Sequence, residues 1–206
     1  MSDQLKQLYL KNSRIPQRYA GEISLRPTNG DAGNFQLLKK IEDNIEMFIK
    51  SHDNLLLSSN IVGNGKTSWA IKILKSFINN YACNYAWKNQ TPAVFINVPE
   101  YLSLKKRSIT DVSLAEEANR LEGLIYDSKL VIFDDIATKT ASEYDKELLY
   151  VYINSRTNNL LTTIYTTNVT KDQLEEVLGA RIADRIIGYS TVVELTGVSL
   201  RGVQFK

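Results

Sequence analysis

The stretch Asn60-Ile-Val-Gly-Asn-Gly-Lys-Thr67 decides the fold of this chain. An apolar run, Leu55-Leu56-Leu57, comes before it, and residues 69–78 after it follow a helical pattern. Strand, Gly-rich turn, Lys-Thr and helix is the order in which a P-loop occurs. The backbone N–H groups of such a loop point at phosphate oxygens, and the helix N-terminus behind the loop adds a favourable dipole. The stretch therefore predicts a phosphate-binding site.

The residues of this loop have distinct expected roles. Lys66 would reach the β- and γ-phosphates of a nucleotide, and Thr67 would hold Mg²⁺. Asn60 stands where the pattern usually begins with glycine. Asparagine tolerates a positive φ better than most residues, so this position weakens the match without excluding it. The expected nucleotide-binding residues are Asn60, Gly63, Asn64, Gly65, Lys66, Thr67 and Ser68.

Composition limits the other possibilities. The chain has 206 residues, enough for one domain with a short appendage, and its net charge of +2 gives no global basic field. A single cysteine, Cys83, excludes an internal disulfide, and with the single histidine, His52, a Cys/His zinc site is not credible. No apolar run approaches the ~18 residues of a membrane span. The N-terminus lacks a signal-peptide core, so we expect a cytoplasmic protein without membrane contact.

Short apolar strands alternate with helical patterns over residues 35–206. This order predicts an α/β fold, in which a five-stranded parallel sheet is sandwiched by helices. Residues 1–34 are polar and interrupted by prolines and glycines. We therefore expect an N-terminal extension there, with a short helix near 3–12, that acts as a linker or docks a partner. The expected strands are 55–58, 94–98, 130–133, 161–167 and 191–195, and the expected helices are 35–50, 66–80, 100–127, 142–157, 171–177 and 180–187.

A pair of carboxylates follows the apolar run 130–133. Asp134 and Asp135 would lie at the carboxyl end of a buried parallel strand, where such sheets bind ligands. We expect Asp134 to hold the water shell of Mg²⁺ and Asp135 to polarise the attacking water. An isolated Asp-Asp pair more often forms a turn or a helix cap, but its place after a P-loop favours the catalytic interpretation.

Three later residues are further catalytic candidates. Asn168 ends an expected strand, where an amide would orient water beside the γ-phosphate; alternatively, it caps the helix expected near 171. Arg181 and Arg185 are four residues apart and share one helix face. Either would stabilise transition-state charge on a neighbouring subunit's γ-phosphate, or pair with Asp184 at the surface.

Seven segments together form a more specific pattern. They are Ile15-Pro-Gln-Arg-Tyr19, Gly63-Asn-Gly-Lys-Thr67, Phe133-Asp-Asp-Ile136, Ile153-Asn-Ser-Arg-Thr-Asn-Asn159, Thr163-Ile-Tyr-Thr-Thr-Asn168, Ala180-Arg-Ile-Ala-Asp-Arg185 and Leu195-Thr-Gly-Val-Ser-Leu-Arg201. In this order they resemble the AAA+ ATPases of the DnaC/DnaI helicase-loader group, which includes the IstB transposition ATPases. The resemblance covers roughly residues 15–202. The Walker motifs occur in many ATPases, whereas the segment 153–168 and the closing Gly-x-Ser-x-Arg are more specific to this group.

The resemblance implies roles for individual residues. Asn168 is similar to the sensor 1 residue, and Arg185, with Arg181 as the alternative, is similar to the arginine finger. Arg201 resembles the late arginine that senses the nucleotide in cis, and Arg156 matches a position that supports the fold or contacts a subunit. The resemblance further implies an AAA+ core, ATP and Mg²⁺ as cofactors, slow hydrolysis, self-assembly into an oligomer, and a replicative DNA helicase and single-stranded DNA as partners.

Two departures from the group concern the ends of the chain. Little sequence follows Arg201, so we expect little or no C-terminal lid domain. Residues 1–34 are too few for the separate helicase-binding domain of cellular loaders, and they lack its zinc cysteines. We therefore expect an ATPase domain over 35–206 in a compact version of the kind that phages or mobile elements encode.

Contact with DNA is expected at Lys105, Lys106 and Arg107. These cations lie near Tyr101, in the region where the family has its DNA-facing insertion, and the combination suits backbone contact with base stacking. The alternative is a solvated helix end, because short basic runs are common and acidic residues follow closely.

The sequence thus predicts an ATP-dependent loader of a replicative hexameric helicase onto single-stranded DNA, with ATP hydrolysed at subunit interfaces. Two alternatives stay open. The first is an IstB-like regulator of transposition, and the second is a nucleotide-gated adaptor that binds a host replication protein with little turnover.

Overall fold

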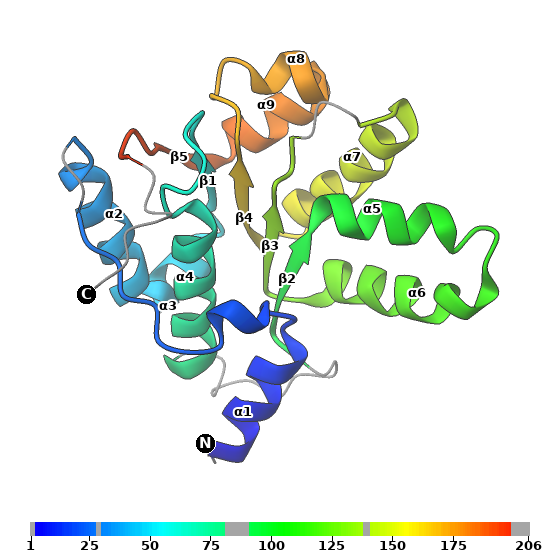
Figure 1. Ribbon diagram of the computed structural model, residues 1–206, viewed down its shortest axis with the longest axis horizontal. Coiled ribbons are helices and arrows are strands. Elements are labelled where there is room, and N and C mark those ends of the chain that lie inside the picture. Colours follow the sequence, from blue (N-terminus) through cyan, green and yellow to red (C-terminus); the bar gives the residue numbers. More distant parts are fainter. Residues whose placement is uncertain (1–2, 28–29, 81–90, 138–140, 199–206) are drawn as a thin grey trace.

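Five parallel strands form the centre of the computed structural model, which describes residues 3–27, 30–80, 91–137 and 141–198 (Figure 1). Their order in the sheet is β2-β3-β4-β1-β5. Because each neighbouring pair is parallel, the carboxyl ends of all five strands lie at one edge of the sheet. The predicted α/β fold is confirmed. The strands are β1 (Asn54–Ser58), β2 (Ala93–Asn97), β3 (Leu130–Asp134), β4 (Thr162–Thr167) and β5 (Ser190–Glu194).

Helices cover both faces of the sheet. They are α1 (Asp3–Asn12), the 3-10 turn η1 (Gln17–Tyr19), α2 (Ala32–Asp43), α3 (Ile45–Lys50), α4 (Lys66–Asn80), α5 (Val98–Arg107), α6 (Val112–Asp127), α7 (Glu143–Asn158), α8 (Leu174–Leu178) and α9 (Ala180–Gly188). One hydrophobic cluster contains residues of α1, α2, α3 and α4 together with strand residues such as Leu55 and Leu57. A second cluster contains residues of α5, α6, α7, α8 and α9 together with the strand residues that alternate with those of the first cluster, such as Leu56. Successive strand residues point to opposite faces, so the apolar runs fill both clusters.

Two of the predicted helices are each divided. The helix predicted over 35–50 is interrupted at Asn44, whose φ of −116° and ψ of 37° are not helical. Its Nδ2 donates to the carbonyl of Lys40 at 2.9 Å, a side-chain bond that competes with the helical pattern. The helix predicted over 100–127 is divided at 108–111, where the Asp111 side chain caps α6. Apolar periodicity continues across both breaks, so it does not reveal them.

The end of β2 differs from its prediction by one residue. Asn97, not Val98, is the last strand residue, because Asn97 Oδ1 accepts from the backbone N–H of Glu100 at 3.1 Å and so caps α5. Pro99 lies in the first turn, where a missing N–H costs nothing. The cap leaves Asn97 at the carboxyl edge of the sheet.

The N-terminal extension packs against the core. Tyr9 of α1 is buried, and the backbone N–H of Phe95 in β2 donates to the carbonyl of Ser13 at 2.8 Å. Asp31 is also buried and accepts from the backbone N–H of Thr196 at 3.0 Å and from its hydroxyl at 2.9 Å. Burial by itself would raise the pKa of Asp31, but these hydrogen bonds outweigh it and the pKa lies below its ordinary value. The segment before α2 is thereby fastened to the residues that follow β5.

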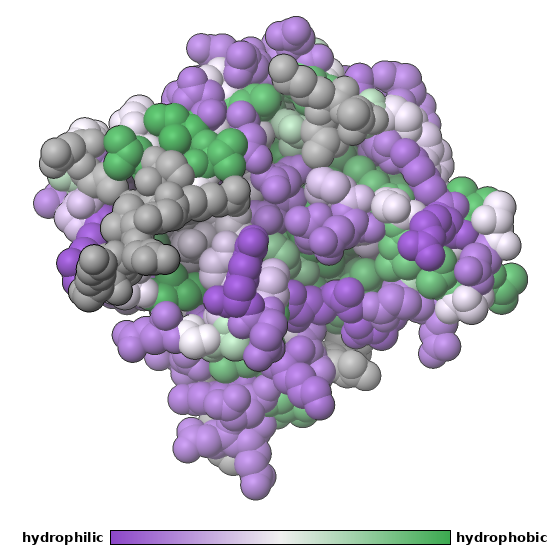
Figure 2. Space-filling view, in the orientation of Figure 1, coloured by the Kyte–Doolittle hydropathy of each residue, from purple (hydrophilic) through white to green (hydrophobic). Residues whose placement is uncertain are grey.

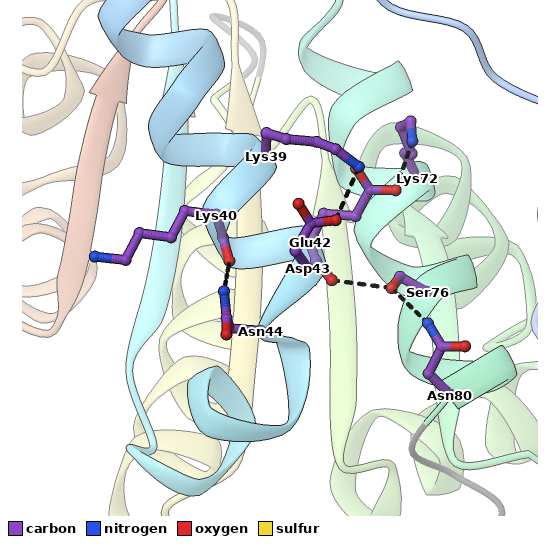
Figure 3. A network of polar contacts seen from close by, with 8 residues as sticks. All are labelled: Lys39, Lys40, Glu42, Asp43, Asn44, Lys72, Ser76 and Asn80. Carbon is purple, nitrogen blue, oxygen red and sulfur yellow. Dashed lines mark hydrogen bonds and ion pairs between the residues drawn. The ribbon is translucent and has the colours of Figure 1, made fainter.

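A polar network joins α2 to α4, the helix that follows the Gly-rich loop (Figure 3). Glu42 pairs with Lys39 at 3.2 Å and with Lys72 of α4, and the Ser76 hydroxyl donates to the carbonyl of Glu42 at 3.0 Å. Each partly exposed ion pair adds at most about 1 kcal/mol. The network therefore orients α4 on α2 more than it stabilises the fold.

Candidate functional site

Two glycines shape the backbone of the loop between β1 and α4. Gly63 and Gly65 have φ values of 85° and 99°, which glycine adopts without steric cost. α4 begins at Lys66, and its first turn closes where the backbone N–H of Trp69 donates to the carbonyl of Gly65 at 2.8 Å. An α-helix leaves its first backbone N–H groups without partners inside the helix, and this helix start follows directly on the loop.

Asn60 lies outside the cavity that the loop encloses. It is not among the described non-glycine residues with a positive φ, so no left-handed backbone is needed at this position. It lines a neighbouring cavity with Lys146 and Asn168. Of the expected nucleotide-binding residues, Asn60 alone is not part of the cavity lining described below.

Lys66 is only 6% exposed and folds over the loop that precedes it. Its Nζ donates to the carbonyl of Ile61 at 3.0 Å and to Asn64 Oδ1 at 3.2 Å. Asn64 is fixed in turn, because its Nδ2 donates to Ser59 Oγ at 2.7 Å and to the carbonyl of Leu195 at 3.0 Å. The lysine ammonium is therefore held inside the loop by oxygen acceptors of the loop itself.

Asp134 lies at the end of β3 beside the start of α4. Its Oδ1 accepts from the hydroxyls of Thr67 at 2.8 Å and Thr166 at 2.7 Å. The carboxylate is 3% exposed. Burial raises the pKa of Asp134 above its ordinary value, and the two hydroxyl donors partly oppose that increase. The structure thus brings together Thr67 and Asp134, as the sequence predicts, and adds Thr166 as their link.

Asp135 and Asn168 also come together, from the ends of β3 and β4. Asp135 has a φ of 55°, an unusual value for a non-glycine residue, and its backbone N–H donates to Thr166 Oγ1 at 3.0 Å. Asn168 Nδ2 donates to Asp135 Oδ1 at 2.7 Å. The alternative role of Asn168 as a helix cap is wrong, because α8 begins only after Gln173.

These residues surround a cavity of about 270 Å³ at the carboxyl edge of the sheet. Its lining comprises Arg18, Tyr19, residues 62–68, Asn97, Asp134, Asp135 and Asn168. The sequence does not predict Arg18, Tyr19 or Asn97 as site residues. Arg18 and Tyr19 belong to the Ile15–Tyr19 segment, and Asn97 pairs in register with Asp134 across β2 and β3. The Ile15–Tyr19 segment can be recognised in the sequence, so Arg18 and Tyr19 could have been found from it. The position of Asn97 beside Asp134 depends on the order of the strands in the sheet.

Comparison with known proteins agrees with this geometry. The chain is 22% identical over 209 residues to the replicative helicase loader DnaI of Bacillus subtilis. The matched region covers 95% of this chain and 63% of that protein. It is 23% identical over 154 residues to the replicative helicase loader DnaC of Escherichia coli K12, which covers 75% of this chain and 58% of that protein. This chain is similar to the DnaI and DnaC helicase loaders. It spans roughly three fifths of the length of these two relatives, and no family model matches it.

Solved structures show the same fold. A crystal structure of the DnaC helicase loader superposes with a TM-score of 0.68 at 20% identity, over 87% of this chain and 99% of the other. DnaI superposes with a TM-score of 0.61 at 17% identity, over 98% and 94%. AMPPCP-bound DnaA from Aquifex aeolicus superposes with a TM-score of 0.59 at 15% identity, over 82% and 47%. The predicted fold, a five-stranded parallel sheet between helices, is therefore shared with these structures. No helix of the described ranges has the length and apolarity for crossing a membrane.

The two arginines of this loader-like chain that were predicted as finger candidates stack on one tyrosine. The guanidinium carbons of Arg181 and Arg185 lie 4.1 Å and 5.7 Å from the ring centroid of Tyr150 in α7. Both cations lower the pKa of the Tyr150 hydroxyl, Arg181 more strongly. Within the described ranges neither arginine forms an ion pair with Asp184, and neither lines the cavity of its own chain.

The other two arginines implied by the resemblance have different outcomes. Arg156 is 1% exposed, so it supports the fold and does not contact another subunit through its side chain. It donates to Thr163 Oγ1 at 2.9 Å and to the carbonyls of Ile125, Ser128 and Thr162 at 2.7, 2.9 and 2.7 Å. Burial lowers the pKa of its guanidinium. Arg201 lies outside the described residues.

The predicted DNA-contact residues are mostly engaged within the chain. Lys105 pairs with Glu122 at 2.6 Å, and Lys106 pairs with Asp145 at 2.6 Å. Tyr101 is buried, and its hydroxyl shares a hydrogen bond of 2.8 Å with another tyrosine, so it cannot stack on a base. Arg107 and Lys106 are both exposed, and contact of these cations with DNA stays a prediction.

Proposed function

We propose that the chain is a Mg²⁺-dependent ATPase whose cavity at the carboxyl edge of the sheet binds the triphosphate. The observation that carries this proposal is the hydrogen-bonded link from Thr67 through Asp134 and Thr166 to Asp135, whose carboxylates line the same cavity as Lys66. A phosphate-binding loop and two carboxylates with fixed hydrogen bonds are the parts that phosphoryl transfer to water requires.

The donors present suit Mg²⁺. A hydroxyl and a carboxylate oxygen 2.8 Å apart are hard oxygen ligands, and Mg²⁺ takes few protein ligands together with phosphate oxygens and water. In the described ranges no cluster of three or more acidic, histidine or cysteine side chains forms a complete protein site. Bound Mg²⁺ would neutralise charge on the β- and γ-phosphates, with Thr67 as ligand and Asp134 holding its water shell.

The hydrolytic step then depends on the chain's own side chains. Asp135 polarises a water whose oxygen attacks the γ-phosphorus, while the bond to the bridging oxygen breaks and ADP leaves. Asn168 orients Asp135 and that water through its amide. Lys66 stabilises negative charge on the β- and γ-phosphates. Asp135 is shorter than the glutamate that many such ATPases carry at this position, so we expect slow turnover.

We further propose that ATP joins neighbouring copies of the chain. Arg185, or alternatively Arg181, would reach the γ-phosphate bound by the next subunit. Both arginines support this role because they are presented together on Tyr150 and do not line the cavity of their own chain. Hydrolysis would then be limited to assembled oligomers.

The similarity to DnaI and DnaC supports a role in loading a replicative helicase onto single-stranded DNA in the cytoplasm. In this proposal residues 35–206 are the ATPase domain and residues 1–34 form an extension that docks a partner. The matched regions cover 63% of DnaI and 58% of DnaC.

One assay separates this function from its rivals. ATP turnover is measured for the wild type and for Lys66→Ala, without DNA, with single-stranded DNA and with duplex DNA. We expect stimulation by single strands and no activity in the variant. Stronger stimulation by duplex would favour an IstB-like regulator, ATP binding without turnover would favour the adaptor, and failure of the wild type to bind ATP would reject the ATPase proposal.

A further inference from the structure

Part of the wall of the nucleotide cavity comes from outside the Walker motifs. Arg18 and Tyr19 belong to η1, more than forty positions before the loop in the sequence, yet they line the same cavity as Lys66, Asp134 and Asp135. The Arg18 guanidinium stacks on the Tyr19 ring, with its carbon 4.8 Å from the centroid. A planar cation is thereby kept at the cavity.

The segment that carries Arg18 is fastened on both sides. On one side, the carbonyl of Ser13 accepts from Phe95 of β2 at 2.8 Å. On the other side, Lys75 of α4 donates from Nζ to the carbonyl of Gly21 at 2.7 Å and also to that of Tyr19. η1 itself closes where the backbone N–H of Tyr19 donates to the carbonyl of Pro16 at 2.8 Å. The turn therefore bridges β2 and α4 (Figure 1), and the position of Arg18 follows from two anchors rather than from a free end.

Charge in the cavity indicates what Arg18 would bind. The cavity is lined by two cations, Arg18 and Lys66, and two carboxylates, Asp134 and Asp135. Arg18 and the two carboxylates therefore face the same space, although they come from distant parts of the sequence. Within the described ranges Arg18 has no carboxylate within ion-pair distance. A guanidinium without such a partner suits a phosphate, which it binds through two parallel hydrogen bonds.

We propose that Arg18 binds the terminal phosphate of the nucleotide in its own chain, opposite Lys66, and so distinguishes ATP from ADP. The proposal rests on ATP binding at the P-loop. It also makes the N-terminal segment sensitive to the nucleotide state. Residues 13–21 would respond to the loss of the γ-phosphate after hydrolysis, because Arg18, the residue that contacts this phosphate, lies within them in η1. This cation acts in cis, unlike Arg185, and is independent of assembly.

The test compares the affinities of the protein for fluorescent ATP and ADP analogues with Mg²⁺, at protein concentrations at which light scattering detects no assembly. Arg18→Ala removes the cation, and Arg18→Gln keeps much of the stem over Tyr19 while removing the charge. We expect both variants to bind ATP roughly tenfold or more weakly, as the loss of a charged hydrogen bond predicts, and to bind ADP within about threefold of the wild type. Arg18 is exposed, so both variants should unfold at the wild-type temperature.

Arg14→Ala is the matched control. Arg14 is a cation four positions earlier that pairs with Glu117 and does not line the nucleotide cavity, so both affinities should be unchanged. The proposal is overturned if Arg18→Gln binds ATP like the wild type, or if it loses ATP and ADP equally. Lys66→Ala distinguishes failure of the P-loop assignment from failure of the role of Arg18. If Lys66→Ala still binds ATP, the P-loop assignment is wrong. If Lys66→Ala loses ATP binding while Arg18→Gln binds ATP normally, only the role of Arg18 is wrong.

Discussion

Asp134 is the residue at which the folding and the proposed chemistry of this chain conflict. A carboxylate buried at the end of β3 loses its hydration, and hydrogen bonds only partly compensate for that loss. Here Thr67 and Thr166 donate to one oxygen, Oδ1, and burial still raises the pKa of Asp134. A charge that destabilises the unliganded fold is consistent with a group that is placed for Mg²⁺ and phosphate.

The first prediction follows from that conflict. Asp134→Asn keeps an oxygen that accepts from both hydroxyls and carries no charge. We expect the variant to lose ATP hydrolysis and to have a higher free energy of unfolding at pH 7 than the wild type. Because the pKa of Asp134 is higher in the folded chain, the wild type regains stability as pH falls and the carboxylate is protonated. The difference in free energy of unfolding between the variant and the wild type should therefore be largest above the pKa that Asp134 has in the folded chain. It should vanish below the ordinary value of 3.8.

Urea unfolding from about pH 3 to 8 measures this difference. Asp172→Asn is the control, because Asp172 is exposed and its replacement should change the free energy of unfolding by less than about 0.5 kcal/mol. A variant at position 134 that is less stable than the wild type at every pH would contradict the prediction.

At the scale of the element, Asp145 connects two helices. It completes a capping box at the start of α7, where the Ser142 backbone N–H donates to its Oδ2 at 2.8 Å and the Ser142 hydroxyl accepts from the Asp145 backbone. Lys106 of α5 donates to the same Oδ2 at 2.6 Å. One carboxylate therefore caps the N-terminus of α7 and orients the α5–α6 hairpin, which projects from the body and exposes hydrophobic residues at its tip (Figures 1 and 2).

The second prediction concerns this carboxylate. Burial alone would raise the pKa of Asp145, but the hydrogen bonds from Lys106 and Ser142 outweigh it and the pKa is lowered. Asp145→Ala should reduce the free energy of unfolding at pH 7 by about 1–2 kcal/mol, the usual cost of a lost cap. Since the folded pKa lies below the ordinary 3.8, the difference should be complete above that value and disappear as pH falls through the folded pKa.

Thermal unfolding of both proteins across that acidic range gives the measurement. Glu143→Ala provides the comparison in the same helical turn, because Glu143 is 86% exposed and pairs only with Lys146 at the surface. Its effect should stay below about 0.5 kcal/mol. If the loss caused by Asp145→Ala persisted unchanged at low pH, its charge would not be the cause.

At the scale of the whole molecule, the proposed site is divided between two surfaces. The cavity opens at the carboxyl edge of the sheet, while Arg181 and Arg185 stack on Tyr150 between α7 and α9 without lining it. A single copy therefore supplies phosphate-binding and carboxylate groups from one surface and finger candidates from another. In a closed or helical assembly of identical subunits such heterologous surfaces meet at every interface.

The third prediction tests that division. Lys66→Ala removes phosphate binding and leaves the arginines, whereas Arg185→Ala removes a finger and leaves the cavity. Each variant alone should hydrolyse ATP at a small fraction of the wild-type rate. Mixtures of the two should recover part of the rate, because some interfaces then combine an intact cavity with an intact arginine. Turnover measured over a series of mixing ratios provides the result.

Assembly must be checked beside the rates, by light scattering of each mixture with ATP. If the mixtures assemble normally but recover no turnover at any ratio, Arg185 does not act on the nucleotide of a neighbouring subunit. Repeating the series with Arg181→Ala then decides between the two arginines, since only the finger variant should show complementation.

Local sequence signals predict most of the elements well. Apolar runs mark each strand within one or two residues, and the P-loop pattern places α4 at residues 66–80, as the structure has it. The breaks at Asn44 and before Asp111 are missed, because apolar periodicity continues across them while single side-chain hydrogen bonds interrupt the helices. The ion pairs of Lys105 and Lys106 are missed for a related reason, because the basic run does not show that Glu122 and Asp145 lie within reach.

By itself, then, the sequence determined the α/β fold, the Gly-rich turn before α4 and the place of Asp134 at the carboxyl end of a strand, because all of these depend on short-range patterns and on parallel strands sharing one carboxyl edge. Only the tertiary structure decided that Arg18 and Asn97 line the cavity, that Asn60 does not, and that Arg156 is buried. Those facts depend on which segments lie side by side in space. The anchoring of η1 to α4 and the strand order β2-β3-β4 bring distant residues together, and no periodicity along the chain encodes such neighbours.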